Sequence, residues 1–176
     1  MIRMAKQDDI AAVAAIYEHI LTEQERGRVS IGWVRGVYPT ERTANEALAA
    51  GELFVDETDG TILAAARINR IQVPEYDLAD WTYPAEPDQV MVLHTLVVEP
   101  AAAGQGIGKR FVKFYEDYAL SQGCPFLRMD TNEINVAARC LYHGLGYQEV
   151  GIVPCDFNGI PGIRLVCLEK NLYLGS

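Results

Sequence analysis

The feature that most constrains the fold is a run in which an apolar strand passes through a glycine cluster directly into a helix. The strand is predicted over residues 90–98, the glycines are Gly104, Gly106 and Gly108, and an apolar stripe at helical spacing follows as far as Gly123. At such a junction glycines let a ligand approach the backbone, and the unpaired N–H groups at the helix start attract anions. The sequence therefore predicts a chain of mixed helices and strands with a phosphate-binding site at this junction.

Basic residues near the glycines indicate an anionic ligand. The spacing of the glycines distinguishes between the known nucleotide-binding motifs. Lys109, Arg110 and Lys113 form a basic island with no acidic residue between positions 100 and 115. A P-loop, G-x-x-x-x-G-K-[ST], does not fit, because residue 103 is Ala and residue 110 is Arg. The dinucleotide motif G-x-G-x-x-G fails at Lys109, although Asp130 lies about twenty residues further on, as that motif expects. Tight packing of the helix on the strand is the structural alternative for these glycines.

Periodicity and turn residues predict the other elements. Helices are expected from Asp8 or Asp9 to Gly27, from a capping box at Thr43–Glu46 to Gly51, and from Asn135 to Gly144 or Gly146. Strands are expected over residues 2–5, 52–56, 61–71, 126–130, 147–153 and 163–168, with a hairpin turn at Asp59-Gly60 and turn-rich loops over 74–89 and 154–162. The expected order is β-α-α-β-β-β-α-β-α-β-β in a single domain, 1–176.

Two blocks of this sequence resemble the GNAT superfamily of N-acetyltransferases. The run from Ala103 to Gly108 is similar to the family's acetyl-CoA motif Q/R-x-x-G-x-G/A, with matches at Gly106 and Gly108 and a departure at Ala103 that removes a side-chain contact to the pyrophosphate. The run from Asn135 to Tyr147 resembles the family's N-x-x-A-x-x-L-Y-x-x-x-G-F/Y. The resemblance covers residues 90–150. It implies an α/β (α+β) GNAT fold: a mixed, mostly antiparallel sheet of six to seven strands, about four helices and a splayed central strand pair.

The resemblance also implies acetyl-CoA as the cosubstrate, held where two strands separate and at the glycine loop. The residues expected to hold it are Leu96, Val97, Val98, Gly104, Gln105, Gly106, Ile107, Gly108, Lys109, Asn135 and Tyr142. Asn135 and Tyr142 share one helix face because they are seven residues apart. Tyr142 is predicted to protonate the departing CoA thiolate, and a tyrosine packed on the core is the alternative.

Attack by an amine of pKa near ~10 needs a base at neutral pH. His94 is the first candidate, because it shares a strand face with Val92 and Leu96 and resembles a histidine of serotonin N-acetyltransferase. A packed histidine is the alternative. Asp130 is the second candidate, since some ribosomal-protein acetyltransferases place an acidic base at this position, and its alternative role is a cap or an ion pair. A water molecule is the third. Cys155 would allow a covalent route, but no histidine lies near it in sequence.

Charge predicts the class of acceptor. The net charge is −9 and the pI is near 4.8, so the chain repels nucleic acid and anionic membranes and attracts cations. Loop 74–89 has five acidic residues and no Lys or Arg, and its aromatic residues Tyr76, Trp81 and Tyr83 are expected, with Trp33, to line the acceptor side. A solvated loop anchored by its aromatics is the alternative.

The sequence thus predicts an N-acetyltransferase that transfers an acetyl group by direct attack to a primary amine, specifically a small cationic one. A protein acetyltransferase acting on N-termini or lysines is one alternative, and a non-catalytic acyl-CoA-binding module is another. The N-terminal residues lack a signal-peptide pattern and no run of eighteen apolar residues occurs, so we expect a cytoplasmic protein without membrane or nucleic-acid partners. The four cysteines lack a C-x-x-C pair, which predicts no metal site. A homodimer is an open alternative to a monomer.

Overall fold

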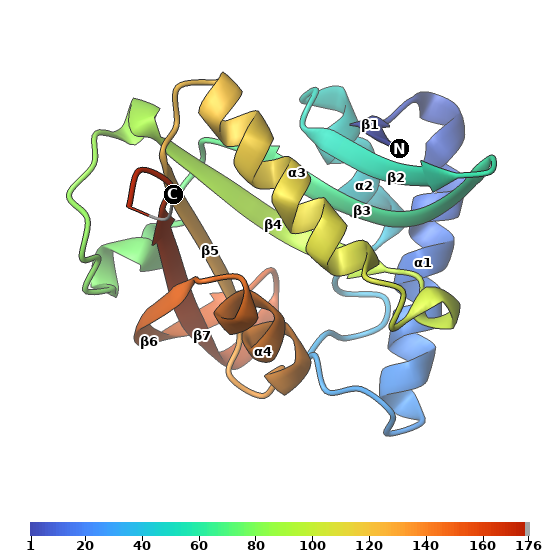
Figure 1. The fold of residues 1–176 in the computed structure, drawn as a ribbon. Coiled ribbons are helices and arrows are strands. Elements are labelled where there is room, and N and C mark those ends of the chain that lie inside the picture. Colours follow the sequence, from blue (N-terminus) through green and yellow to red (C-terminus); the bar gives the residue numbers. More distant parts are fainter. Residues whose placement is uncertain (175–176) are drawn as a thin grey trace.

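One seven-stranded sheet, in the order β1-β2-β3-β4-β5-β7-β6, organises the computed structural model, which describes residues 1–174 (Figure 1). The strands are β1 (Ile2–Met4), β2 (Leu53–Thr58), β3 (Thr61–Asn69), β4 (Val90–Val98), β5 (Phe126–Asn132), β6 (Gln148–Phe157) and β7 (Ile160–Asn171). The helices are α1 (Ile10–Glu25), α2 (Glu41–Ala49), α3 (Ile107–Ser121) and α4 (Val136–Gly144). Neighbouring strands are antiparallel except β4 and β5, so the predicted element order and mixed sheet are confirmed.

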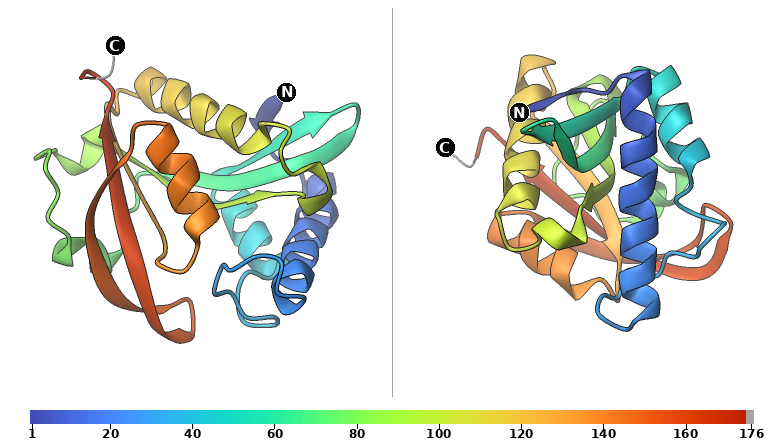
Figure 2. Two further views of the ribbon diagram at one scale, coloured as in Figure 1. Left: turned by 60° about the horizontal axis from the view of Figure 1, so that its bottom comes forward. Right: turned by 90° about the vertical axis from the view of Figure 1, so that its right-hand side faces the viewer.

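The helices form two layers, with α1 and α2 on one face of the sheet and α3 and α4 on the other (Figure 2). The apolar stripe of α1, which includes Val13 and Ile16, packs with Val55 and Val97 of the sheet. The apolar stripe of α3, which includes the fully buried Phe111, packs against the opposite face of the sheet. Burying one large apolar side chain contributes about 1.5–3 kcal/mol, so the two stripes fix which face each helix covers.

Helix α1 begins directly after Asp9, one of the two predicted capping residues, whereas helix α2 begins earlier than predicted. A short 3-10 turn, Gln7–Asp9, precedes α1, and the Asp9 carboxylate binds Arg3 as well as the Lys6 N–H. Helix α2 begins at Glu41 with Thr40 as its N-cap, and the Thr43 hydroxyl accepts a hydrogen bond from the Thr40 N–H at 3.0 Å. The predicted capping box therefore lies inside the first turn, because Thr43 can serve at the N3 position as well as at a cap.

The two hairpins differ in how well the sequence predicts them. The Asp59-Gly60 turn between β2 and β3 is confirmed, and both residues adopt the positive φ that such a tight turn requires, 49° and 77°. The predicted loop 154–162 is wrong, because β6 and β7 extend through it and turn at Asn158-Gly159. Pro154 indicated a loop, but β6 lies at the sheet edge, where a strand tolerates proline.

The central strands separate at the point where the site forms. Strands β4 and β5 pair only from Val90 to Leu93 and from Phe126 to Met129, after which their facing edges are unpaired. The register against β3 also shifts, which places Thr95 and Leu96 opposite a single residue, and Thr95 has φ of 53°. This is a β-bulge, which bends a strand and redirects its backbone groups. The predicted splayed strand pair is confirmed.

No helix within residues 1–174 is both long enough and apolar enough to cross a membrane.

Candidate active site

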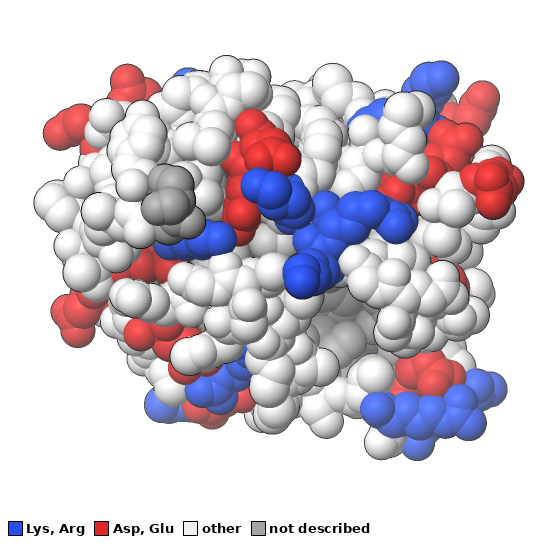
Figure 3. Space-filling model, viewed as in Figure 1, with Lys and Arg blue, Asp and Glu red and all other residues white. Residues whose placement is uncertain are grey.

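A cavity of about 1140 Å³ lies between the separated strands and the two helical layers. One end, which we call the glycine side, is formed by β4, the loop 99–106 and the starts of α3 and α4. The other end, the aromatic side, is formed by the loop 26–40 between α1 and α2, by β3 and by the β6–β7 hairpin. Figure 3 shows a hollow beside the face covered by α3, where Lys and Arg atoms gather.

The glycine side presents backbone N–H groups. Gly104 and Gly106 adopt positive φ of 80° and 73°, and a side chain on either would meet no atom within 4 Å, so the loop is open on that side. The first backbone bond of α3 runs from the Arg110 N–H to the Gly106 carbonyl at 2.9 Å, which leaves the N–H groups of residues 107–109 without a helical partner. Partial positive charge at the helix start adds to these donors.

The three residues of the basic island have different partners. The Arg110 guanidinium donates to the buried Asp56 carboxylate at 2.8 Å, and Lys113 pairs with Asp117 at 2.9 Å. Lys109 lines the cavity and forms no ion pair within the described residues. Lys109 is thus the member of the island that is available to an anion.

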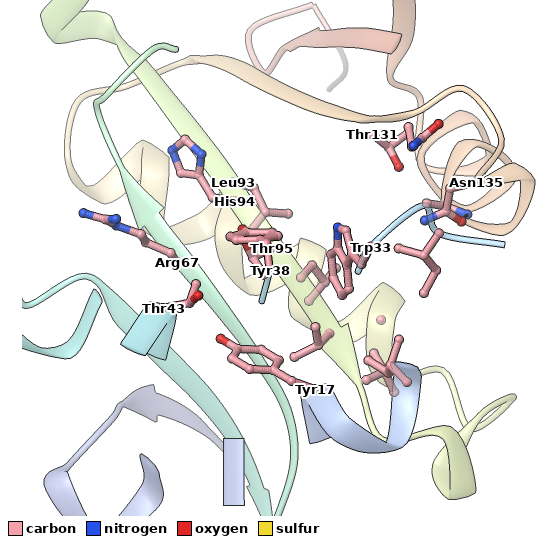
Figure 4. A pocket seen from close by; sticks show the side chains of 18 of the residues that line it. Tyr17, Trp33, Tyr38, Thr43, Arg67, Leu93, His94, Thr95, Thr131 and Asn135 are labelled. Carbon is pink, nitrogen blue, oxygen red and sulfur yellow. Dashed lines mark hydrogen bonds between the residues drawn. The ribbon is translucent and has the colours of Figure 1, made fainter. Parts of the chain in front are cut away.

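Helix α4 points Asn135 and Tyr142 to the cavity. Asn135 is the N-cap, and its side-chain oxygen accepts the Ala138 N–H at 3.1 Å, which leaves the amide nitrogen free to donate (Figure 4). Tyr142 is 7 % exposed and packs edge-on against Tyr147. Burial, reinforced by the nearby Asp130 carboxylate, raises the pKa of Tyr142, so its hydroxyl stays protonated at neutral pH.

Asp130 lies within β5, one residue beyond the last pair of that strand with β4, and lines the cavity. The Tyr76 hydroxyl donates to its carboxylate at 2.7 Å. Burial raises the pKa of Asp130 to about 6, and the hydrogen bond from Tyr76 acts in the opposite direction. A carboxylate with a pKa near neutrality can take up and release a proton at physiological pH.

His94 also lines the cavity, but a polar network holds its ring. Its Nε2 lies 2.8 Å from the Asn69 side-chain oxygen, which also accepts the Ile71 N–H, while the Asn69 amide nitrogen donates to Glu52. Because an amide oxygen can only accept, Nε2 carries the proton. Burial and the neighbouring Arg67 lower the pKa of His94 to about 4, so the ring is neutral near pH 7 and weakly basic.

The aromatic side is roofed by side chains from distant segments. The Tyr38 ring packs edge-on against Trp33 at 5.9 Å and against Phe157 at 5.2 Å, and its hydroxyl forms a hydrogen bond with that of Thr95 (Figure 4). The loop comes so close to β5 that a side chain at Gly32 would overlap Asn132, with its Cβ 2.2 Å from the amide nitrogen. These contacts cover the aromatic side of the cavity.

Four residues predicted for the site do not line the cavity: Tyr76, Trp81, Tyr83 and Gln105. The Trp81 Nε1 donates to the Tyr76 carbonyl at 2.7 Å, and the Arg128 guanidinium lies 4.3 Å from the Trp81 ring. Loop 74–89 thus packs on the same sheet face as α1 and α2, over the part of that face that these helices do not cover. An apolar cluster that includes Tyr76 anchors it there. Its aromatics were expected to contact the acceptor, but their rings serve packing, and only the Tyr76 hydroxyl reaches a cavity residue.

The residues of the cavity wall that sequence reasoning missed include Tyr17, Arg67 and Thr95. The sequence does mark Arg67 as a candidate site residue, because it is a charged residue within the apolar strand 61–69. The sequence does not mark Thr95, because nothing in the apolar run of its strand indicates a β-bulge. Tyr17 lies on the helix face that also forms the core, and periodicity does not distinguish the two roles.

A comparison with protein families shows which family the chain is related to. The model of the acetyltransferase (GNAT) family matches residues 13–147. The chain belongs to the GNAT family. The match spans α1 to α4, so the splayed strands, the glycine loop and the Tyr142 helix of this GNAT chain all lie inside it.

Individual relatives support the same family over shorter segments. Bovine thialysine N-epsilon-acetyltransferase is 33% identical over 75 residues, 43% of this chain and 44% of the relative. The N-alpha-acetyltransferase RimI of Mycobacterium tuberculosis is 40% identical over 60 residues, 34% of this chain and 36% of the relative. The chain thus matches less than half the length of either relative.

Solved structures show the fold over the whole chain. A GNAT-family acetyltransferase from Streptococcus agalactiae superposes with a TM-score of 0.81 at 24% identity, covering 97% of this chain and 94% of that one. A Salmonella typhimurium structure that contains its cofactor acetyl-CoA superposes with a TM-score of 0.65 at 21% identity, covering 98% and 93%. Within residues 1–174, no group of three or more His, Cys, Asp or Glu side chains could hold a metal ion.

Proposed function

We propose that this chain is an acetyl-CoA-dependent N-acetyltransferase that passes the acetyl group by direct attack to the primary amine of a small, cationic molecule. The observation that carries the proposal is that one cavity joins unpaired strand backbone and a glycine loop to a proton acceptor, Asp130, and a proton donor, Tyr142. Binding and chemistry therefore share a single enclosed space.

The glycine side fits the two chemical parts of CoA. Pantetheine is a chain of amides, and the unpaired edge of β4 beyond Leu93 offers the N–H and C=O groups that such a chain needs. The pyrophosphate is an anion, and the free N–H groups of residues 107–109, with Lys109, suit it. The departure at Ala103 removes a side-chain contact and leaves these backbone donors intact.

Proton transfer needs a base that takes the ammonium proton and an acid that meets the leaving thiolate. Asp130, with a pKa of about 6, is the better base, because His94, with a pKa of about 4, is too weakly basic to deprotonate an ammonium near neutrality. Tyr142 remains protonated and lines the same cavity, so its hydroxyl can donate to the thiolate sulfur. The bulge at Thr95 and Leu96 supplies a backbone N–H to stabilise the developing oxyanion.

Direct attack is favoured over a covalent acyl-enzyme. Cys155 is the cysteine that the sequence offers for a covalent route, but burial and the nearby Glu75 raise its pKa to about 12. At neutral pH the thiol is protonated, and the thiol is a far poorer nucleophile than the thiolate. The amine must then attack the thioester itself.

A small acceptor is favoured over a protein, because the loop 26–40 meets the β6–β7 hairpin and closes the aromatic side. A Cβ at Gly159 of the hairpin tip would lie 3.4 Å from the Val37 side chain. One relative is named for thialysine, an amino-acid derivative, and the other is named an N-alpha-acetyltransferase, so the test compares small amines with peptides.

Release of the CoA thiol tests the proposal with acetyl-CoA and a panel of alkylamines, polyamines, amino acids, aminoglycosides and peptides. We expect amine-dependent thiol release with a small amine and little with peptides. Peptides as the best acceptors would indicate the protein acetyltransferase. Tight acetyl-CoA binding without thiol release for any amine would indicate a non-catalytic acyl-CoA-binding module.

A further inference from the structure

Three polar side chains lie side by side across the sheet, on the face that the aromatic side covers. Arg67 of β3 pairs directly with His94 of β4, and the last β4–β5 pairs place Asp130 one step further on, beside His94. Neighbouring strands are about 4.8 Å apart, and residues at matching positions share a face. Arg67 and Asp130 therefore stand at the two ends of a row on one face of the sheet, with His94 between them.

Asp130 has no cation to balance its charge. Within the described residues, its carboxylate accepts the Tyr76 hydroxyl and forms no salt bridge. A desolvated carboxylate without a positive partner is unfavourable, so a cationic group of a ligand gains from binding there. On the function proposed above, that group is the ammonium of the acceptor.

Arg67 has unused donors at the opposite end. Its Nε donates to Glu52 at 2.6 Å, and its two terminal nitrogens form no hydrogen bond in the part of the chain that the structure describes. The side chain is 33% exposed and lines the cavity. Two terminal N–H groups in one plane are suited to a carboxylate.

Both charges act on the Tyr38 hydroxyl, which lies on the aromatic side of the cavity. Burial raises the pKa of Tyr38 to about 12, and both neighbours contribute, Asp130 in the same direction and Arg67 in the opposite one. Both charges therefore act on the same small volume under the aromatic roof. A diamine or polyamine placed there would bring its second ammonium to the terminal nitrogens of Arg67, and both groups can only donate hydrogen bonds.

From this row we infer that the acceptor is an amino acid: besides its cationic amine it carries a carboxylate, with the amine at Asp130 and the carboxylate on the terminal nitrogens of Arg67. This inference rests on the proposed function and narrows its substrate class. The chain's acidity favours cations in general, but the local pair of opposite charges selects a zwitterion over a pure cation.

Calorimetric binding to the protein saturated with CoA tests the inference without requiring turnover. The probes are ω-amino acids compared with the diamine and the alkylamine of equal chain length, whose amines have similar pKa values, together with the common α-amino acids. We expect the tightest-binding amino acid to bind roughly 10- to 100-fold more tightly than the matched diamine or alkylamine, the usual gain from hydrogen bonds to a charged group.

Substitutions then assign that preference to Arg67. Arg67→Gln should abolish the preference and Arg67→Lys should retain part of it, while unchanged acetyl-CoA affinity shows that both variants fold. Arg164→Gln removes the same charge from an exposed residue that pairs with Glu133 and does not line the cavity, and it should leave the preference intact.

The inference is overturned if the diamine or alkylamine binds as tightly as every amino acid, or if folded Arg67→Gln keeps the preference. Thiol release, measured separately, reports on the proposed function: zwitterion binding without any thiol release would overturn the transferase proposal and leave the binding result standing.

Discussion

The glycine side of the cavity is formed mainly by backbone groups, whereas the aromatic side is formed by side chains. On the glycine side, one continuous stretch, residues 94–109, supplies strand edge, loop and helix start, and its binding groups are mainly backbone. On the aromatic side, Trp33, Tyr38, Arg67 and Phe157 come from three separate segments, and their side chains form the wall. Backbone donors recognise a constant ligand, whereas side chains can change without altering the sheet. The comparison teaches that cosubstrate binding and acceptor choice can be altered independently.

The largest effect should come from Gly106→Val, which we expect to abolish measurable acetyl-CoA binding. A β-branched residue strongly disfavours the φ of 73° found at Gly106, so the helix start must rearrange and its N–H donors are misdirected. Loss of two charge-assisted hydrogen bonds corresponds to an affinity loss of at least about 100-fold.

Gly123→Val is the matched control, because Gly123 has φ of 76° just beyond the other end of the same helix and a Cβ added there would meet no atom within 4 Å. It should reduce stability and leave acetyl-CoA affinity unchanged in calorimetry. Equal affinity in folded Gly106→Val would show that the glycine side does not bind the pyrophosphate.

The next largest effect should come from Asp130→Asn, which removes the base and retains its shape. We expect kcat/KM to fall by roughly 100-fold or more with acetyl-CoA affinity unchanged. In the unsubstituted protein kcat/KM should rise as the pH increases through about 6, because the base must be ionised, and this rise should disappear in Asp130→Asn.

His94→Gln separates the two base candidates in the same pH titration. Because the pKa of His94 is about 4, its removal should leave the rise near pH 6 in place. A pH profile that keeps this rise in Asp130→Asn and loses it in His94→Gln would return the role to the histidine.

Tyr142→Phe should lower kcat at least tenfold and leave acetyl-CoA affinity nearly unchanged, since it removes the hydroxyl and keeps the ring that packs against Tyr147. Steady-state kinetics with calorimetry measures both quantities. Full activity in this variant would mean that the thiolate leaves without a proton donor and that Tyr142 is a packing residue.

The smallest effect should come from Tyr76→Phe, which probes the link between loop 74–89 and the cavity. The hydroxyl of Tyr76 stabilises the ionised Asp130, so its loss should move the rise in kcat/KM to higher pH, with less than a tenfold change at pH 8. Tyr83→Phe, in the same loop but away from Asp130, should leave the profile in place. An unshifted profile in Tyr76→Phe would show that the loop has no part in the chemistry.

The glycine side could be predicted from sequence because its determinants are local. Strand, glycine and helix follow one another along the chain, and the Asn135–Tyr142 spacing places two residues on one helix face without knowledge of the rest. The element order followed from the same local patterns, and the splayed strand pair followed from the family resemblance that they carry.

The aromatic side could not be predicted because its determinants are distant in sequence. The Tyr76 hydroxyl bonds a residue 54 positions away, and Arg67 meets His94 through strand register. A half-buried aromatic ring that packs in a core cluster, like Trp81, and one that lines a cavity, like Trp33, have the same sequence signature. Only the packing of the whole chain distinguishes them.

The most direct test of the central claim is hydrogen exchange, measured by mass spectrometry with and without acetyl-CoA. If acetyl-CoA lies along the unpaired edge of β4 and its pyrophosphate binds the start of α3, peptides covering residues 95–98 and 104–109 should be protected. The same peptides should be unprotected in Gly106→Val, and those from β1 and β2 should not change in either protein. Saturating acetyl-CoA that leaves both segments unprotected, or that protects another surface, would contradict the account.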